Sequence, residues 1–286
     1  MYNCKPLVSA ENIDLDLFVS TLKVSAGYDF SNYSEKSLRR RVAKVLGDEK
    51  LDQPELLIEI QRNKKFAEKI VREITVNTTD LFRDPAIWKS LKNTVLPSIS
   101  AMPHITIWHA GCSTGQEVYS LLVLLNELNL LSKVRVFGSD INSEVLGVAQ
   151  RGIYKWRFNT HYLENFRQVY ADEGLDLATV DALFYKYFTI DEKSDVIKVN
   201  DIILNKAEFV THDLVTQPCA FYSNSFELIL CRNVVIYFNS TLQDNVFKLF
   251  ADKLDDSSFL LLGLHESILG SSSNLFEKKE IGYIKR

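Results

Sequence analysis

The stretch from Ile105 to Leu125 constrains the fold more than any other part of this 286-residue chain. Ile105–His109 has the apolar and β-branched character of a strand, Ala110–Gly115 is a turn of small residues, and a helical pattern begins at Glu117. Glycines in such a turn let the backbone come close to a ligand, because they carry no Cβ. In an open α/β sheet this turn would lie beyond the carboxyl end of a strand, where ligands bind.

The chain beyond residue 104 alternates short apolar segments with helical ones. This alternation predicts an α/β fold with a mainly parallel sheet covered on both faces. Residues 154–204 interrupt the alternation and predict a small antiparallel insertion, with a hairpin turn at Asp191–Asp195. We expect strands at Ile105–His109, Val134–Ser139, Glu208–His212, Phe226–Cys231 and Phe259–Leu264, and helices that include Glu117–Leu131 and Thr241–Leu254.

The amino-terminal part of the chain has a different pattern. Apolar residues recur at helical spacing through residues 1–75 and predict a small all-helical domain. Residues 76–104 are expected to form a linker that contributes to the ligand site, with a helix at Ala86–Leu96 that Pro97 ends. Residues 105–286 then form the α/β domain.

One predicted helix of the amino-terminal domain carries a run of cations without an acid among them. The apolar residues of this segment fall on the opposite side of a helical wheel, so the cations form one basic face. This basic face is either a solvated helix surface or a docking surface for an acidic partner. Its members are Lys36, Arg39, Arg40, Arg41 and Lys44.

Composition excludes several classes of protein. The net charge of −4 gives no indication of nucleic-acid binding. The four cysteines form no C-x-x-C pair, so neither a zinc site nor a disulfide framework is expected. Met1–Lys5 does not begin a signal peptide, and no apolar run approaches the ~20 residues that span a bilayer. We therefore expect a cytoplasmic protein without membrane insertion, without a metal and without a nucleic-acid partner.

The second strand narrows the class of ligand, because it ends in Gly138-Ser139-Asp140. An acid at this position can accept both hydrogen bonds of a ribose diol. The G-x-G-x-x-G and G-x-x-x-x-G-K-[ST] fingerprints of pyrophosphate sites are absent from the sequence. A nucleoside without a phosphate cradle fits this combination, and S-adenosyl-L-methionine is such a cofactor.

The same turn also matches G-x-S-x-G, the nucleophile elbow of hydrolases, with Ser113 as nucleophile and His265 as a late histidine. In such hydrolases several strands precede the elbow strand. Ile105–His109 is instead the first strand expected in this sheet. The hydrolase hypothesis is therefore the weaker one.

Five segments together closely resemble the CheR family, whose members methylate glutamate side chains of chemotaxis receptors with S-adenosyl-L-methionine. The segments are Asn77–Asp84, Ala110–Ser120, Ser139–Asn142, Arg151–Tyr154 and Cys231–Phe238. The resemblance implies a sheet of the class I S-adenosylmethionine-dependent methyltransferase type. It also implies a protein-glutamate O-methyltransferase that produces glutamate methyl ester and S-adenosyl-L-homocysteine.

Residue by residue, the resemblance also implies a cofactor site and places Tyr237 near the transferred methyl. Our hypothesis from the chemistry is that Arg83 and Tyr237 orient the substrate carboxylate, which is ionised near neutral pH and needs no general base. Asp213 stands where the family usually has asparagine, and Gly263–Glu266 departs from the family's G-x-S-E. The implied cofactor residues are Asn77, Thr79, Arg83, Gly111, Glu117, Asp140, Asp213, Leu214, Arg232 and Asn233.

Each of three side chains also has a purely structural interpretation. Arg83 could pair with Asp80 or Asp84, Tyr237 could be a core aromatic residue, and Asp140 could cap the helix that follows it.

The resemblance implies a partner as well, the acidic helical methylation region of a chemoreceptor, for which the basic face would be the docking surface. The insertion lies where some family members grip a receptor tether, although its strands here are fewer. We expect a monomer. The alternative function is a non-catalytic signalling protein that binds S-adenosyl-L-methionine or S-adenosyl-L-homocysteine.

Overall fold

The computed structural model describes residues 12–217 and 225–286, so Met1–Lys5, Cys4 and Cys219 lie outside the described residues. Four helices come first and share a hydrophobic core of their own. Asp14, Asp52 and Asn63 cap the first, third and fourth of them by accepting backbone N–H groups. The helices are α1 (Leu15–Ala26), α2 (Glu35–Glu49), α3 (Gln53–Arg62) and α4 (Lys64–Ile74).

The linker helix is longer than predicted, and the expectation that Pro97 ends it was wrong. Helical structure runs through α5 (Pro85–Ser90), a π-helical turn at Leu91–Val95 and α6 (Leu96–Ile99). The N–H of Leu96 bonds to the carbonyl of Leu91, five residues back. This π turn shifts the hydrogen-bond register just before the proline, which then occupies the first turn of α6, where its missing N–H costs little.

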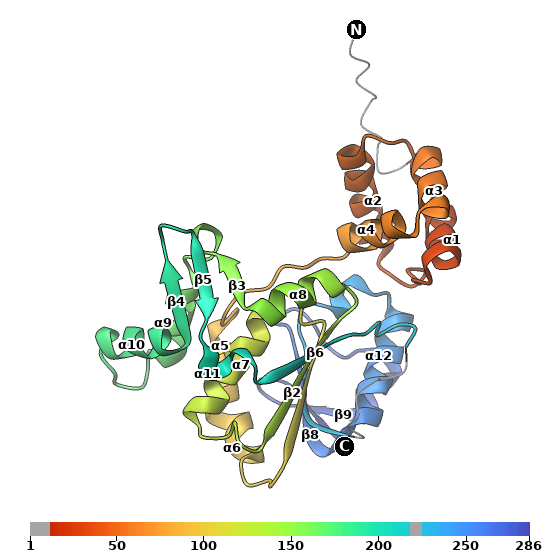
Figure 1. Ribbon diagram of the computed structural model, residues 1–286. Coiled ribbons are helices and arrows are strands. Elements are labelled where there is room, and N and C mark those ends of the chain that lie inside the picture. Colours follow the sequence, from red (N-terminus) through yellow and green to blue (C-terminus); the bar gives the residue numbers. More distant parts are fainter. Residues whose placement is uncertain (1–11, 218–224) are drawn as a thin grey trace.

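A seven-stranded sheet forms the centre of the molecule (Figure 1). Its order is β6-β2-β1-β7-β8-β10-β9, and the first five of these strands are parallel. The predicted α/β fold with a mainly parallel sheet is confirmed. The strands are β1 (Ile105–Ala110), β2 (Val134–Asp140), β6 (Ala207–Thr211), β7 (Phe226–Cys231), β8 (Leu254–Leu262), β9 (Phe276–Lys278) and β10 (Tyr283–Lys285).

The two faces of this sheet belong to different hydrophobic clusters. Ile105 and Ile107 of β1 pack on the side of α7 (Gln116–Glu127), whereas Trp108 and Ala110 pack on the side of α12 (Ser240–Lys253). Alternate residues of a strand point to opposite faces, so this strand contributes to both cores. A strand buried on both faces reads as a continuous apolar run, which explains why its pattern is recognisable in the sequence.

The insertion contains the predicted hairpin and one unexpected strand. The hairpin pairs β4 (Phe188–Asp191) with β5 (Val196–Val199) around the predicted turn. The third strand, β3 (Ile153–Lys155), pairs with the other edge of β5. The helices around this small sheet are α8 (Ser143–Arg151), α9 (Tyr162–Tyr170), α10 (Leu177–Tyr187) and α11 (Asp201–Leu204), with a short 3₁₀ turn at Trp156–Phe158.

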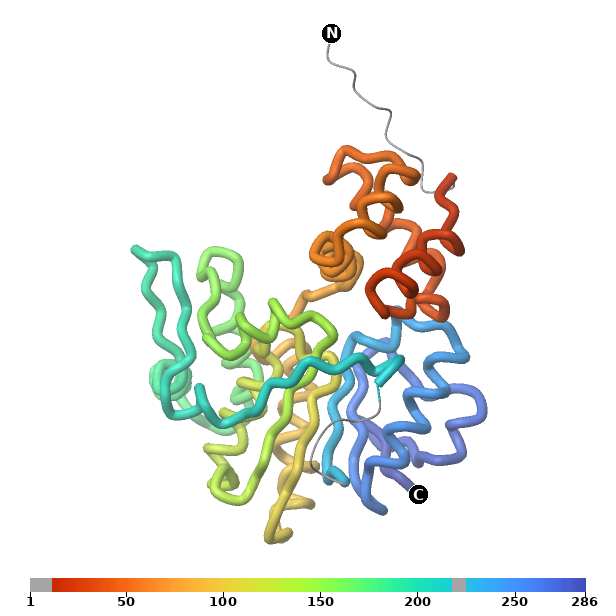
Figure 2. Tube along the Cα trace, turned by 45° about the vertical axis from the view of Figure 1, so that its right-hand side comes forward, coloured from red at the N-terminus to blue at the C-terminus, as the bar shows by residue number. Residues whose placement is uncertain are grey.

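The helical group α1–α4 stands apart from the sheet and is joined to it by the segment before α5 (Figures 1 and 2). Backbone hydrogen bonds connect the two parts directly. The N–H of Ser34 donates to the carbonyl of Tyr237 at 2.7 Å, and the N–H of Asn239 donates to the carbonyl of Asn32 at 2.8 Å. Within residues 12–217 and 225–286, no helix is long and apolar enough to cross a membrane.

Candidate functional site

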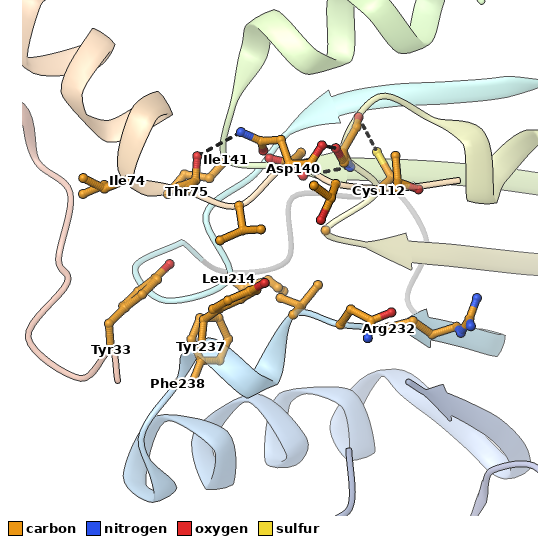
Figure 3. A pocket seen from close by; sticks show the side chains of 18 of the residues that line it. Tyr33, Ile74, Thr75, Cys112, Asp140, Ile141, Leu214, Arg232, Tyr237 and Phe238 are labelled. Carbon is orange, nitrogen blue, oxygen red and sulfur yellow. Dashed lines mark hydrogen bonds between the residues drawn. The ribbon is translucent and has the colours of Figure 1, made fainter. Parts of the chain in front are cut away.

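A pocket lies where four neighbouring parallel strands end (Figure 3). Gly111 follows β1, Asp140 ends β2, Asp213 comes two residues after β6, and Arg232 follows β7. The space enclosed, including the open mouth, is about 1070 Å³. The topology therefore brings the predicted residues to one cavity.

All ten residues predicted to bind a cofactor line this pocket, and so does Tyr237. They come from the linker, the β1 turn, the first turn of the helix Gln116–Glu127 and the ends of three other strands, which are far apart in the sequence. The pocket also has lining residues that the sequence analysis did not predict. Among these, Tyr33, Ser37 and Leu38 come from the amino-terminal helical group.

The turn after β1 has the backbone that its glycines suggested. Gly111 has a φ of +80°, and a Cβ added there would lie 2.5 Å from Cγ2 of Val234. An alanine would therefore be strained by its backbone and would displace the loop after β7. The turn is held by the N–H of Ser113, which donates to Oδ2 of Asp140 at 2.9 Å.

Ser113, the candidate nucleophile of the hydrolase hypothesis, has a structural bond instead. Its Oγ donates to the carbonyl of Asn77 at 3.1 Å, which joins the β1 turn to the linker. His265 is exposed in the loop after β8. Neither residue is arranged as a serine nucleophile with its base, which would require a hydrogen bond between them.

Asp140 is buried at the end of β2, and its two oxygens accept backbone N–H groups from Ser113 and Asn142. Burial raises the pKa of Asp140, and these hydrogen bonds offset only part of that effect. The side chain of Asn142, not that of Asp140, accepts the N–H of Glu144 at the start of α8. The interpretation of Asp140 as a helix cap is therefore wrong.

Glu117 and Arg232 form a buried ion pair. The Arg232 side chain is 1% exposed and contacts Oε2 of Glu117 at 3.0 Å and Oδ2 of Asp84 at 2.7 Å. Oε1 of Glu117 lies 3.0 Å from Nδ1 of His109. Burial acts to raise the pKa of Glu117, but Arg232 and His109 outweigh it and the pKa is lowered. Glu117 is therefore kept as an anion at the edge of the pocket.

Arg83 lies in the pocket wall without the predicted structural partners. Asp84 pairs with Arg232 instead, and Asp80 contacts His161 at 3.1 Å. Within the part of the chain that the structure describes, the one hydrogen bond of the Arg83 side chain is a long one, 3.4 Å, to the carbonyl of Thr78. Its guanidinium retains donors for a ligand.

Tyr237 is only partly buried, and its ring points into the pocket, while its neighbour Phe238 is part of the core (Figure 3). The interpretation of Tyr237 as a core residue is therefore wrong. The 3₁₀ turn Val235–Tyr237, which follows β7, turns the tyrosine toward the cavity.

Asp213 is buried and uses its carboxylate within its own loop. Its oxygens accept the N–H of Val215 at 2.8 Å and the hydroxyl of Thr216 at 2.6 Å. An aspartate in place of asparagine is satisfied here by local donors. Leu214 follows it and presents an apolar side chain to the pocket.

The sequence analysis missed the role of Glu266. This buried carboxylate accepts the N–H groups of Gly263, Asn233, Val234 and Ile236 at 2.6 to 3.2 Å. It thus holds the loop that carries Arg232, Asn233 and Tyr237. The available signal was the retained glutamate of the altered Gly263–Glu266 segment.

The structure divides the residues of the predicted basic face. Lys36, Arg40 and Lys44 are exposed along α2, with Lys44 3.5 Å from Asp48. Arg39 pairs with Glu35 and donates to the carbonyl of Ile13, so it also fastens α2 to the segment before α1. Arg41 is partly buried.

The donor set of the pocket fits S-adenosyl-L-methionine. Glu117, Asp140 and Asp213 place three carboxylates in the wall, and one of the two guanidiniums, that of Arg232, is already paired. An acidic cavity suits a cofactor that carries a sulfonium and an ammonium group. The missing Cβ of Gly111 lets a ligand come close to the backbone of the turn. The carboxylate of Asp140 can accept further hydrogen bonds, as a ribose diol requires.

Comparisons with known proteins indicate the family of the chain. The model of the CheR methyltransferase, SAM binding domain, matches residues 77–283. A Pseudomonas putida protein named methyltransferase Cher3 is 32% identical over 95% of this chain and 96% of its own length. A chemotaxis protein methyltransferase of Listeria monocytogenes is 25% identical over 88% of this chain and 89% of its own length.

Among solved structures, the magnesium protoporphyrin IX methyltransferase of Synechocystis PCC 6803 with bound SAH is similar with a TM-score of 0.32 and 15% identity. That match covers 70% of this chain and 66% of the other.

Proposed function

This chain belongs to the CheR family of S-adenosylmethionine-dependent methyltransferases, and from that premise we propose that it methylates glutamate side chains of a chemoreceptor. The products would be glutamate methyl ester and S-adenosyl-L-homocysteine. The observation that carries the proposal is the pocket wall, where Arg83 and Tyr237 face the same cavity as the nine other residues predicted to bind the cofactor.

The proposed acceptor suits a site without a general base. A glutamate carboxylate titrates near pH ~4.3 and is a nucleophile at neutral pH. When bound, S-adenosyl-L-methionine supplies a methyl group on a sulfonium. A carboxylate oxygen forms the new bond to that carbon, the electron pair of the broken bond returns to sulfur, and no proton is exchanged.

The protein must hold the acceptor in line and remove its water. In this role Arg83 contributes charge and two parallel donors, and Tyr237 contributes a hydroxyl donor. Positioning of this kind can be worth roughly 7–11 kcal/mol. Arg232 is excluded as the orienting cation because Glu117 and Asp84 already neutralise it.

The exposed cations of α2 provide the docking surface in this proposal. Lys36, Arg40 and Lys44 lie on the helix that also contributes Ser37 and Leu38 to the pocket. An acidic receptor helix bound along these cations would lie beside the active site, where charge complementarity sets its register. Because one chain contains every group assigned here, we propose that it acts as a monomer.

A transfer assay tests the proposal. The purified protein is mixed with methyl-labelled S-adenosyl-L-methionine and membranes that carry chemoreceptors. Label on the receptor supports an enzyme, whereas cofactor binding without label would support the non-catalytic signalling protein. The Arg83→Ala variant is the control for label transferred by other enzymes of the membranes.

A further inference from the structure

Tyr33 lies in the loop between α1 and α2, outside the sheet domain, and yet it lines the cofactor pocket. Figure 3 shows its ring opposite the β2 end and beside Tyr237, with the hydroxyl directed toward the cavity. The cofactor residues predicted from the sequence begin only at Asn77, so this tyrosine was not among them. Its position makes the amino-terminal helical group one wall of the pocket.

The ring of Tyr33 is held in place on two sides. Its centroid lies 4.5 Å from that of Phe30 in the same loop and 5.0 Å from that of Phe238 after β7. A β-bridge joins Tyr33 to Phe238. It lies between two backbone hydrogen bonds, one from the N–H of Ser34 to Tyr237 and one from the N–H of Asn239 to Asn32. A hydroxyl on a ring held in this way is preorganised, so its use in binding costs little side-chain entropy.

The hydroxyl of Tyr33 faces the acidic end of the pocket. Burial raises the pKa of this phenol, and the carboxylates of Asp213 and Asp140 raise it further. The hydroxyl therefore stays protonated and can donate. Within residues 12–217 and 225–286 no protein group accepts a hydrogen bond from it, so it is free to donate to a ligand.

We propose that Tyr33 donates a hydrogen bond to the nucleoside part of S-adenosyl-L-methionine. Asp140 and Asp213, the two carboxylates that influence this hydroxyl, line the same pocket, and Asp140 is the group that fits a ribose diol. The opposite end, with Glu117 and Arg232, suits the amino-acid part. This inference rests on the pocket being the cofactor site and is independent of the receptor and of the methylated residue.

The same contact would couple the two parts of the molecule. Cofactor binding would stabilise the arrangement in which the α1–α2 loop contacts Phe238, the residue after Tyr237. That loop leads into α2, whose first turns carry Ser37 in the pocket and Lys36 and Arg40 outside it. Coupling between two binding sites is reciprocal. A partner that fixes α2 would therefore raise the affinity for the cofactor by the same factor by which the cofactor raises the affinity for the partner.

The test measures ligand binding by titration calorimetry, without turnover or receptor. Tyr33→Phe removes the hydroxyl and keeps the ring between Phe30 and Phe238. Tyr28→Phe is the matched control, because Tyr28 lies in the same loop and does not line the pocket. The ligands are S-adenosyl-L-homocysteine and 5′-methylthioadenosine, which keeps the nucleoside and lacks the amino-acid part.

We expect Tyr33→Phe to weaken both ligands by the same factor, about 2- to 12-fold, the usual range for one neutral hydrogen bond. Tyr28→Phe should bind both as the unmodified protein does, and all three proteins should unfold at the same urea midpoint. Unchanged affinity of Tyr33→Phe for both ligands would overturn the inference. So would a loss confined to S-adenosyl-L-homocysteine, because the hydroxyl would then serve the amino-acid end.

These outcomes are separate from those of the proposed function. A protein that binds both ligands through Tyr33 and transfers no methyl group would retain this inference and lose the proposed activity. If the unmodified protein methylates receptors and the Tyr33→Phe variant binds both ligands with unchanged affinity, the proposed activity stands and this inference is wrong.

Discussion

At the scale of single residues, two buried carboxylates of the pocket have opposite pKa shifts because their neighbours differ. Among the described residues Asp140 has backbone donors and no cation beside it, so burial prevails and its pKa is raised. Glu117 has Arg232 and His109 beside it, and its pKa is lowered despite burial. As the pH is lowered, cofactor binding should therefore respond to protonation of Asp140 before protonation of Glu117.

The affinity for S-adenosyl-L-homocysteine should fall on acidification. The ribose diol needs the ionised carboxylate of Asp140, so affinity is full above the raised pKa and is lost as the pH falls through it. Glu117 keeps its charge to lower pH, and its stabilising ion pair is lost only as the pH falls through its own lowered pKa. Calorimetric titration over a pH series measures this loss. Affinity that stays flat down to about pH 3.9, the ordinary value for aspartate, would contradict the assignment.

Arg83 and Tyr237 should affect the rate more than cofactor affinity. Arg83→Ala removes a charge-assisted contact worth about 1.5–3 kcal/mol, so the rate at saturating cofactor should fall by roughly 10- to 150-fold. Tyr237→Phe removes one hydroxyl donor and should reduce the rate less, by about 2- to 12-fold. Single-turnover methylation measures both. If both variants keep the unmodified rate, the assignment is wrong.

At the scale of elements, Glu266 makes the loop after β7 depend on the loop after β8. Replacing Glu266 by glutamine leaves one oxygen to accept the backbone N–H groups that two oxygens accept now. The amide N–H₂ in the place of the other oxygen would face backbone N–H donors. We expect Glu266→Gln to lower the free energy of unfolding by about 2–4 kcal/mol and to weaken S-adenosyl-L-homocysteine binding. Urea unfolding measures the first effect, and Glu280→Gln, at an exposed glutamate, is the control. Equal midpoints for the two variants would contradict this role.

Elements were predictable where their own residues determine them. The strands β1 and β7 are apolar runs buried along most of their length, and Phe226–Cys231 was predicted with its observed bounds. The strands β3, β9 and β10 were missed because each has only three residues and forms through pairing with distant segments. The prediction that Pro97 ends the helix failed because a π turn precedes the proline. This turn is a change in hydrogen-bond register, which residue propensities do not reveal.

The site shows the same limit. Asp140, Glu117 and Arg232 lie next to recognisable strands, so their convergence follows from the topology of a parallel sheet. Tyr33 and Glu266 enter the site through contacts across the molecule. Neither contact leaves a periodic pattern in the sequence.

At the scale of the whole molecule, the helical group and the sheet domain together form the pocket, and the exposed cations of α2 lie beside it. Reversing Arg40 and Lys44 to glutamate should raise the Michaelis constant for receptor and leave S-adenosyl-L-homocysteine affinity unchanged. Steady-state kinetics over a salt series measures this, because salt screens such exposed charges.

Lys64→Glu with Lys65→Glu is the matched control for that variant. It makes the same change in net charge at exposed positions on α4 of the same helical group. An equal rise in the Michaelis constant for both double variants would show that overall charge, and not the α2 surface, attracts the receptor.

The most direct test of the central claim is the chemical identity of the transferred methyl group. Receptor labelled by this protein from S-adenosyl-L-methionine is treated with mild base, and the released methanol is measured while peptides are mapped by mass spectrometry. We predict that the label leaves as methanol and that the modified residues are glutamates. Label that survives base, or that maps to another residue type, would contradict a protein-glutamate O-methyltransferase.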